Sequence, residues 1–204
     1  MKLYGSKGCG SVIVELMLEL AHIEYTFIDA IQWQPFTRHP DLLKLNPLGQ
    51  VPVLVLDDGS VMTESAAIVL WLAEKIPGMI PPNPSIRAVF QRWMIFVPAN
   101  MYAVFAFRDF PQRWVDGDVA QAQFKEKLTE RLRECWRVLE SELKPGPYLL
   151  GADMCALDPY LAMLGRWTPG REWITTHCPH VAASLARTEQ HPAVNAMWKR
   201  NFTL

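Results

Sequence analysis

Four prolines gather in one short stretch of the chain and set its organisation. Pro77, Pro81, Pro82 and Pro84 fall within eight residues. Proline has no main-chain N–H and a fixed φ, so neither a helix interior nor a strand interior tolerates this density. The stretch therefore predicts a linker over residues 77–85, which joins an N-terminal domain over residues 1–76 to a second domain over residues 86–204.

Composition narrows the class of protein. The 204 residues can hold one large domain or two small ones, and half of them are hydrophobic, which gives a sizeable core. The formal net charge of −1 gives no electrostatic case for nucleic acid. The longest apolar stretch, residues 93–107, is interrupted and too short to span a membrane, and the N-terminus lacks the apolar core of a signal peptide. The four cysteines form no CxxC pair. We therefore expect a cytoplasmic protein with free thiols.

The first domain is expected to be α/β. Alternating strand and helix patterns predict strands at 2–4 and 25–29, helices at 11–21 and 65–76, and a loose helix at 36–44. A hairpin of 52–56 and 60–62 is expected around Asp57-Asp58-Gly59, because Asp-Gly is a strong hairpin turn signal. This β-α-β-α-β-β-α order predicts a mixed four-stranded sheet with helices on both faces.

The second domain is expected to be all-helical. No strand pattern recurs after the linker, and helical periods predict helices at 86–109, 119–143, 156–167, 179–189 and 193–200. Pro98 should kink the first of these. Asp158, three residues after Cys155, is expected to cap its helix reciprocally and to serve folding.

Two neighbouring motifs predict a site for a small peptide. A proline directly before a strand, at Val51-Pro52, is a candidate cis peptide that would turn the Val51 N–H and C=O outward as a short strand edge. Glu64 and Ser65 open an apolar helix, where free N–H groups and the helix dipole favour a carboxylate, and Glu64 can hold an amine beside it. A γ-glutamyl peptide suits this combination, although Glu64 and Ser65 also fit a plain helix start.

These motifs resemble those of the cytosolic glutathione transferases. The resemblance covers essentially the whole chain, and its look is closest to the bacterial beta-type branch. It is carried by Asn46-Pro47-Leu48-Gly49-Gln50-Val51-Pro52-Val53-Leu54, by Thr63-Glu64-Ser65-Ala66-Ala67-Ile68, and by residues 151–158 with Tyr160-Leu161. The resemblance implies a thioredoxin-like N-terminal domain, an all-helical C-terminal domain, glutathione as co-substrate and a homodimer.

The resemblance also implies roles for single residues. Val51 would pair with the cysteinyl backbone of glutathione after Pro52, Glu64 and Ser65 would take its γ-glutamyl end, and Gln50 would lie beside them. The beta-type branch departs from this chain at several positions. The catalytic cysteine of that branch aligns with Gly10, and its interdomain histidine aligns with Tyr102. Its helix-capping Ser or Thr aligns with Cys155. Where that branch has a basic residue after the second strand, this chain has Gln32, Trp33 and Gln34, of which Gln34 is the expected contact.

Three residues compete for the role of thiol activation: Cys9, Ser11 and Ser6. A transferase needs one hydroxyl or thiol donor at the start of the first helix to hold glutathione as thiolate. Cys9 lies between glycines just before that helix, so it is expected to be acidified and is a candidate nucleophile or mixed-disulfide partner; the alternative is a small buried thiol. Ser11 is more typical of a plain N-cap, and Ser6 is the weakest candidate.

The electrophile pocket is expected between the two halves of the chain. Its candidate residues follow the Pro98 kink or lie on a later helix, and they are Asn100, Tyr102, Phe105, Arg108 and Trp167. The alternative is that the aromatic ones simply pack in a core, as aromatic residues at helical spacing usually do. The histidines show no metal spacing, so no metal is expected. His177-Cys178-Pro179-His180 lacks further partners for a zinc site.

The leading hypothesis is a glutathione transferase that conjugates small hydrophobic electrophiles. Two alternatives remain open: a glutathione-dependent thiol-disulfide reductase that uses Cys9, and a non-catalytic binding module of the same fold. An isomerase is a variant of the first, but this chain has Gly8 and Cys9 where that branch has paired serines. The residues of the second-substrate pocket are too generic to identify the electrophile.

Overall fold

A computed structural model describes residues 1–33, 35–143 and 146–202. The chain divides into two compact units: unit 1 is Met1–Ile80 with Glu189–Leu204, and unit 2 is Pro81–Thr188. The sequence placed the last helix in the second domain, whereas the structure packs it within unit 1. The domain boundaries expected from the sequence stay a prediction.

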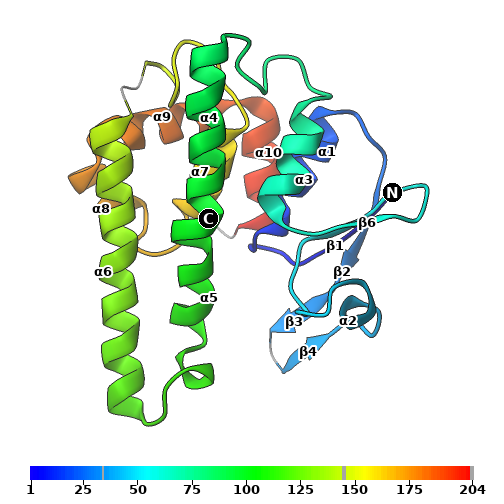
Figure 1. The fold of residues 1–204 in the computed structure, drawn as a ribbon, viewed down its shortest axis with the longest axis vertical. Coiled ribbons are helices and arrows are strands. Elements are labelled where there is room, and N and C mark those ends of the chain that lie inside the picture. Colours follow the sequence, from blue (N-terminus) through cyan, green and yellow to red (C-terminus); the bar gives the residue numbers. More distant parts are fainter. Residues whose placement is uncertain (34, 144–145, 203–204) are drawn as a thin grey trace. The chain divides into compact units, whose positions relative to one another are not determined.

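Unit 1 contains the mixed four-stranded sheet predicted from the sequence (Figure 1). Its strands are β1 (Lys2–Gly5), β2 (Thr26–Asp29), β5 (Val53–Val55) and β6 (Val61–Met62), in the order β2-β1-β5-β6. β1 is parallel to β2 and antiparallel to β5, and β5 is antiparallel to β6. Leu3 of β1 pairs with Leu54 of β5, and both side chains are fully buried.

Three helices of unit 1 pack together: α1 (Ser11–Leu20), α3 (Ser65–Ala73) and α10 (Pro192–Asn201). α1 is apolar on nearly all sides and is buried from Ser11 to Leu18, as expected for a core helix. Its two acidic residues are satisfied by α10. Asn201 Nδ2 donates to Glu15 Oε1 at 2.8 Å, and Arg200 forms an ion pair with Glu19.

The loose helix expected over 36–44 is wrong for most of its length. Phe36–Arg38 forms β4, which pairs antiparallel with β3 (Ile31–Trp33), and only Leu42–Leu45 is helical, as α2. The reason is Pro40, because a proline pushes the residue before it out of the α region. β3 and β4 form a second, two-stranded sheet that the sequence reading missed.

Unit 2 is built from helices. α4 (Pro84–Phe96) continues as a π-helical segment (Val97–Tyr102) and then as α5 (Ala103–Asp109), so the expected bend at Pro98 takes the form of a widened turn. Pro98 cannot donate to a carbonyl one turn earlier, and such a loss is absorbed locally by π geometry. The other helical segments are Pro111–Arg113 (3₁₀), α6 (Asp118–Glu142), α7 (Leu157–Leu164), α8 (Arg171–His177) and α9 (Pro179–Gln190).

α8 was not predicted, because its seven residues are mostly polar and only Ile174 is buried. Among the helices of the described part of the chain, none combines the length and the apolar character needed to cross a membrane.

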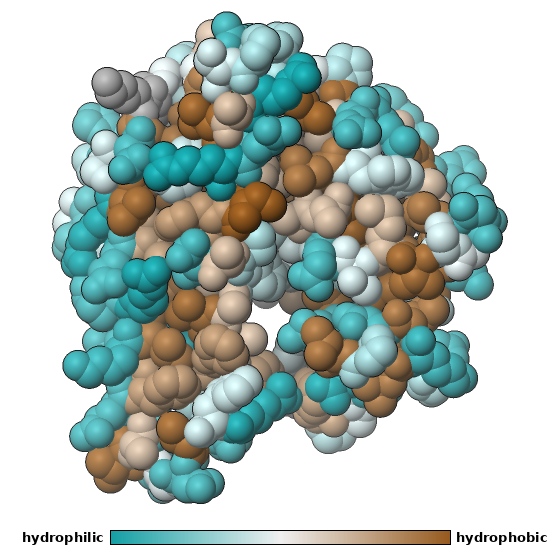
Figure 2. Space-filling model, viewed as in Figure 1, coloured by the Kyte–Doolittle hydropathy of each residue, from teal (hydrophilic) through white to brown (hydrophobic). Residues whose placement is uncertain are grey.

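α4 exposes apolar side chains, and Figure 2 shows brown, hydrophobic surface over this helix. Its exposed residues of this kind are Ile86, Val89 and Ile95.

Asp158 is fully buried and ties the start of α7 to the segment before it. Its Oδ1 accepts the Leu149 N–H at 2.8 Å, and its Oδ2 accepts the Cys155 N–H at 2.9 Å and the Cys155 thiol at 3.2 Å. The reciprocal cap expected from the sequence is therefore only half formed. Asp158 accepts the Cys155 N–H, but the Cys155 thiol is itself a donor to Asp158. Burial raises the pKa of Asp158, because its charged form is desolvated.

We expect Asp158→Ala to destabilise the protein. The substitution leaves two buried N–H groups without an acceptor, which costs about 2–4 kcal/mol and lowers the Tm by about 5–10 °C. Thermal unfolding followed by circular dichroism measures this. Asp153→Ala, at an exposed position in the same segment, is the matched control, and an equal Tm for the two variants would contradict the role given to Asp158.

Candidate functional site

The loop before β5 is fixed by two side chains. Asn46 Nδ2 donates to the Gln50 carbonyl at 3.0 Å, and Asn46 Oδ1 accepts the Leu48 N–H at 3.1 Å. Arg38 Nε donates to the Gly49 carbonyl at 3.0 Å. Gly49 has φ +61°, and a Cβ there would lie 3.0 Å from Arg38 Nε, so glycine is required on both grounds.

Val51 follows this loop and keeps its main-chain groups unused. The Val51–Pro52 peptide bond is cis, and β5 begins only at Val53. Within residues 1–33, 35–143 and 146–202, the Val51 N–H and C=O make no hydrogen bond. Val51 is half-buried while Gln50 beside it is exposed, so a short main-chain edge is available at the surface of unit 1.

Glu64 precedes α3 in an unusual backbone conformation. Its φ is +62° and its ψ is 103°, its side chain is exposed, and that side chain makes no capping hydrogen bond. A non-glycine residue in such a conformation costs about 1–3 kcal/mol, and strain of this kind clusters at functional sites. Ser65, the first residue of α3, is buried. The N-terminal end of a helix carries the positive end of its dipole, so the start of α3 favours an anion.

Ser6, Cys9 and Ser11 form one hydrogen-bonded cluster. Ser11 Oγ accepts the Ser6 N–H at 3.0 Å and lies 3.1 Å from the Ser6 carbonyl, to which it donates. Ser11 is therefore not the N-cap expected from the sequence. Gly10 holds that position, and Ser11 folds back on the strand. Gly5 makes room for it, since a Cβ at Gly5 would lie 2.5 Å from Ser11 Oγ.

Cys9 is the most exposed member of this cluster, because Ser6 and Ser11 are only 2% and 1% exposed. Its Sγ donates to the Ser6 carbonyl at 2.9 Å and lies 3.3 Å from Ser11 Oγ. Burial raises the pKa of the Cys9 thiol and outweighs the hydrogen bonds from Ser11 and Ser6 that lower it. The expected acidification of Cys9 is thus contradicted: desolvation exceeds the effect of the helix start.

The β3–β4 hairpin contributes residues that the sequence reading did not assign to a site. Trp33 Nε1 donates to Ser6 Oγ at 3.1 Å, and Ser6 Oγ donates to the Ile31 carbonyl at 3.1 Å. The Ser6 hydroxyl therefore already donates its one hydrogen and accepts one hydrogen bond. The Trp33 and Phe36 rings lie 6.0 Å apart, and the Arg38 guanidinium lies 4.7 Å from the Phe36 ring centre. Gln34 lies outside the described residues.

In unit 2, three of the five residues predicted for the electrophile pocket come together. The ring centres of Tyr102 and Trp167 are 5.7 Å apart, those of Phe105 and Trp167 5.1 Å, and those of Tyr102 and Phe105 6.5 Å, all edge to face. Such pairs are favourable beyond their buried area.

The other two predicted residues are directed to α6. Asn100 Oδ1 accepts from Arg131 at 3.2 Å, and Arg108 Nε donates to Thr129 Oγ1 at 2.9 Å. The helix from which they come presents one face to the aromatic cluster and another to α6, and spacing alone did not separate the two faces.

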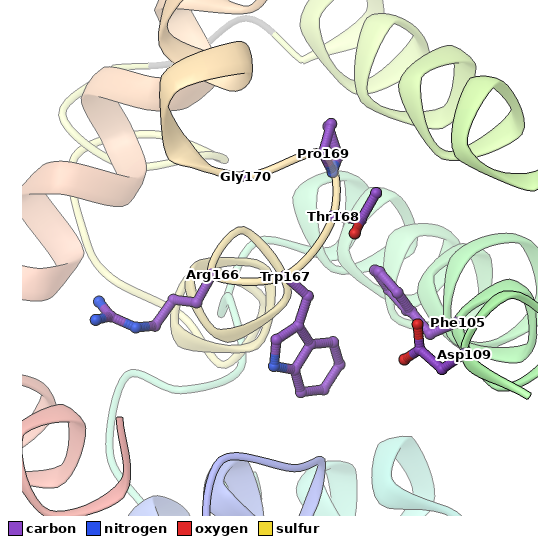
Figure 3. Close-up of a pocket in the computed structure, with 7 residues that line it drawn as sticks. All are labelled: Phe105, Asp109, Arg166, Trp167, Thr168, Pro169 and Gly170. Carbon is purple, nitrogen blue, oxygen red and sulfur yellow. The ribbon is translucent and has the colours of Figure 1, made fainter. Parts of the chain in front are cut away.

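A pocket of about 370 Å³ opens beside the aromatic cluster. Figure 3 shows Phe105 and Asp109 projecting from the same helix toward Trp167 and Thr168. Asp109 lies one turn after Phe105, a spacing that could have identified it. The full lining is Phe105, Asp109, Arg166, Trp167, Thr168, Pro169 and Gly170.

The structure offers no metal centre in its described ranges, where no three His, Cys, Asp or Glu side chains are grouped to hold an ion. His180 of the sequence His177-Cys178-Pro179-His180 pairs with Glu140, with Nδ1 and Oε1 2.8 Å apart. Cys178 is buried, and burial raises its pKa to about 11.

Comparison with known proteins gives consistent matches. The family described as "Glutathione S-transferase, N-terminal domain" matches residues 11–75. The chain is 37% identical to the uncharacterized GST-like protein YncG of Escherichia coli K12, over 98% of each chain, and 26% identical to glutathione S-transferase GstA of Escherichia coli O157:H7, over 95% of each. A glutathione transferase homologue from Sulfitobacter, solved with bound glutathione, superposes with a TM-score of 0.85 at 26% identity and covers 99% of this chain and 98% of its own.

The raised pKa of Cys9 predicts the pH dependence of its alkylation. A thiol whose pKa lies above its ordinary value is protonated at pH 7, and only the thiolate reacts. Iodoacetamide should therefore modify Cys9 slowly at pH 7, at a rate that rises about tenfold per pH unit up to pH 9. Peptide mass mapping measures this, with Cys9→Ala as the control. A rate already constant between pH 6 and 8 would show an acidic thiol and contradict the assignment.

Proposed function

The chain belongs to the glutathione S-transferase family, and we propose that it is a glutathione transferase that conjugates glutathione to small hydrophobic electrophiles. In this reaction the glutathione thiol loses its proton, its sulfur bonds to carbon, and the leaving group departs with its electron pair. The observation that carries the proposal is the unpaired Val51 edge in the same unit as the strained, exposed Glu64 at the start of α3.

In this proposal the tripeptide is bound by its main chain and its two ends. The Val51 N–H and C=O pair with the cysteinyl residue as a one-residue strand after Pro52. Glu64 binds the γ-glutamyl ammonium, and Ser65 with the first N–H groups of α3 binds the α-carboxylate. Gln50, exposed next to Val51, contacts the same end.

The glycyl carboxylate needs a cation, and Arg38 supplies it. Its Nε donates to the carbonyl of Gly49, two residues before Val51, and this bond supports a place for the guanidinium near the peptide edge. Arginine binds a carboxylate through its remaining N–H groups. Gln34 remains a proposed contact.

Cys9 is proposed as the donor that holds the glutathione thiolate, with Ser11 and Ser6 as the residues that position it. Both hydroxyls are buried and are already bonded within the cluster, whereas Cys9 is partly exposed. Burial keeps the pKa of Cys9 high, so the proton stays on its sulfur. In the structure this thiol donates to the Ser6 carbonyl, and in the proposal it turns from that carbonyl to donate to the glutathione sulfur. The same property disfavours the reductase alternative, because a mixed disulfide needs Cys9 as thiolate.

Tyr102, Phe105 and Trp167 are proposed to form the wall that receives the electrophile, with Asn100 and Arg108 behind it. We further propose a homodimer in the cytoplasm. The exposed apolar residues of α4 support association, because they leave apolar surface on one helix that a second copy would cover.

Glutathione binding tests this proposal directly. We expect calorimetry to show binding of glutathione and the purified protein to turn over 1-chloro-2,4-dinitrobenzene. Glu64→Ala should weaken glutathione binding about tenfold or more, because it removes a charge-assisted hydrogen bond. Glu74→Ala, at the exposed far end of α3, is the matched control. No binding at millimolar glutathione would overturn both enzyme hypotheses in favour of a non-catalytic module.

The role of Arg38 is separable from its support of the loop. Arg38→Ala should weaken glutathione about tenfold relative to wild type, but should weaken γ-glutamylcysteine, which lacks the glycyl carboxylate, far less. Calorimetry with both peptides measures the difference. Equal losses for the two peptides would show that Arg38 acts only through Gly49.

A further inference from the structure

Among the residues that line the unit 2 pocket, Asp109 is the one with an acidic side chain. Asp109 contributes a carboxylate, which accepts only, and Pro169 has no N–H to offer. Thr168 adds one hydroxyl, which can both donate and accept. Figure 3 shows the Asp109 carboxylate on the Phe105 side of the pocket, facing Trp167 and Thr168.

The two arginines near the pocket leave one oxygen of the Asp109 carboxylate without a hydrogen bond from the described part of the chain. Figure 3 shows the Arg166 side chain pointing away from the space between Trp167 and Phe105. Arg108 is held on α6 by Thr129, and its Nη1 donates to Asp109 Oδ1 at 3.0 Å. This bond occupies one carboxylate oxygen and leaves Oδ2 without a hydrogen bond to any described residue.

The aromatic wall and the carboxylate lie at a fixed spacing. Phe105 and Asp109 stand one turn apart on α5, so a ring placed against Phe105 and Trp167 brings a substituent on its edge toward Asp109. Arg108 is already anchored by Thr129, whose hydroxyl in turn donates to the Lys125 carbonyl at 2.8 Å, so the carboxylate is oriented before a ligand arrives. The pocket volume of about 370 Å³ suits a compound of one or two rings.

We propose that this pocket selects aromatic compounds that carry a hydroxyl or amine donor, and that it discriminates against their carboxylates. The ring packs on Phe105 and Trp167, and the donor binds Asp109 Oδ2. Only the identification of this compound as the electrophile rests on the proposed function. The selectivity itself concerns unit 2 and is measured without glutathione.

Three two-ring probes of matched shape test the selectivity: 2-naphthol, 2-methoxynaphthalene and 2-naphthoate. Binding to the full chain is measured by calorimetry at pH 7 in the absence of glutathione. In the wild-type protein 2-naphthol should bind about five- to tenfold more tightly than its methyl ether, since a hydrogen bond to a half-exposed carboxylate lies at the low end of the charge-assisted range. The carboxylate should bind most weakly.

Variants assign the selectivity to Asp109. Asp109→Leu should abolish the preference for 2-naphthol, leave 2-methoxynaphthalene unchanged or tighter, and strengthen 2-naphthoate about threefold or more by removing a like charge. Asp116→Leu, an exposed acidic residue in the following loop, is the control that keeps the wild-type order. Circular dichroism establishes that each variant is folded.

Several outcomes would overturn the proposal. They are equal binding of 2-naphthol and its methyl ether to the wild type, a preference that survives in Asp109→Leu, or no binding of any probe. Glutathione binding is measured in a separate experiment. If the protein failed to bind glutathione but kept its preference for 2-naphthol, the proposed function would be refuted and the selectivity of the pocket would stand.

Discussion

Three hydrogen bonds in the loop from Asn46 to Gln50 determine how unit 1 presents the main chain that precedes β5. Asn46 and Arg38 bond the groups that precede Val51, so the loop is rigid without any use of the Val51 main chain. Buried main-chain groups are nearly always paired, so the unpaired N–H and C=O of half-buried Val51 support the proposal that this edge binds another peptide. An extended peptide fits such an edge, since its main chain offers a donor and an acceptor at the matching spacing.

The start of α1 shows how burial can reverse the effect of a helix terminus on a thiol. The helix dipole and the neighbouring N–H groups lower the pKa of a cysteine, but removal from water raises it. At Cys9 the second effect is larger, because Sγ packs against Ser6 and Ser11. A protonated thiol at this position is a donor, which suits the stabilisation of a ligand's thiolate better than nucleophilic attack.

The sequence predicted the features that depend on local chemistry. Asp57-Asp58-Gly59 identified its hairpin because the turn needs a residue with positive φ, and Gly59 has φ +83°. Phe36–Arg38 was misread as helix, because three residues are too few to show an alternating pattern. Arg38 and Trp33 were not assigned to the site, because their partners Gly49 and Ser6 are brought to them only by the fold.

In unit 2, too, the sequence did not show which side chains would be brought together by the fold. Tyr102, Phe105 and Trp167 were predicted to lie together, and their rings do pack together, while their role in binding an electrophile stays a prediction. Arg108 was expected to contact ligand, yet it bonds Thr129 and Asp109, so its influence reaches the pocket through the orientation of a carboxylate. Asp109, the residue that faces the pocket, is an ordinary helix-end acid in the sequence. In the proposed selectivity, the aromatic wall fixes where a bound ring lies, and the Asp109 carboxylate at its edge decides which rings are preferred. A ring without a hydrogen-bond donor at that edge would remove water from the carboxylate and give it no partner in return, which costs free energy.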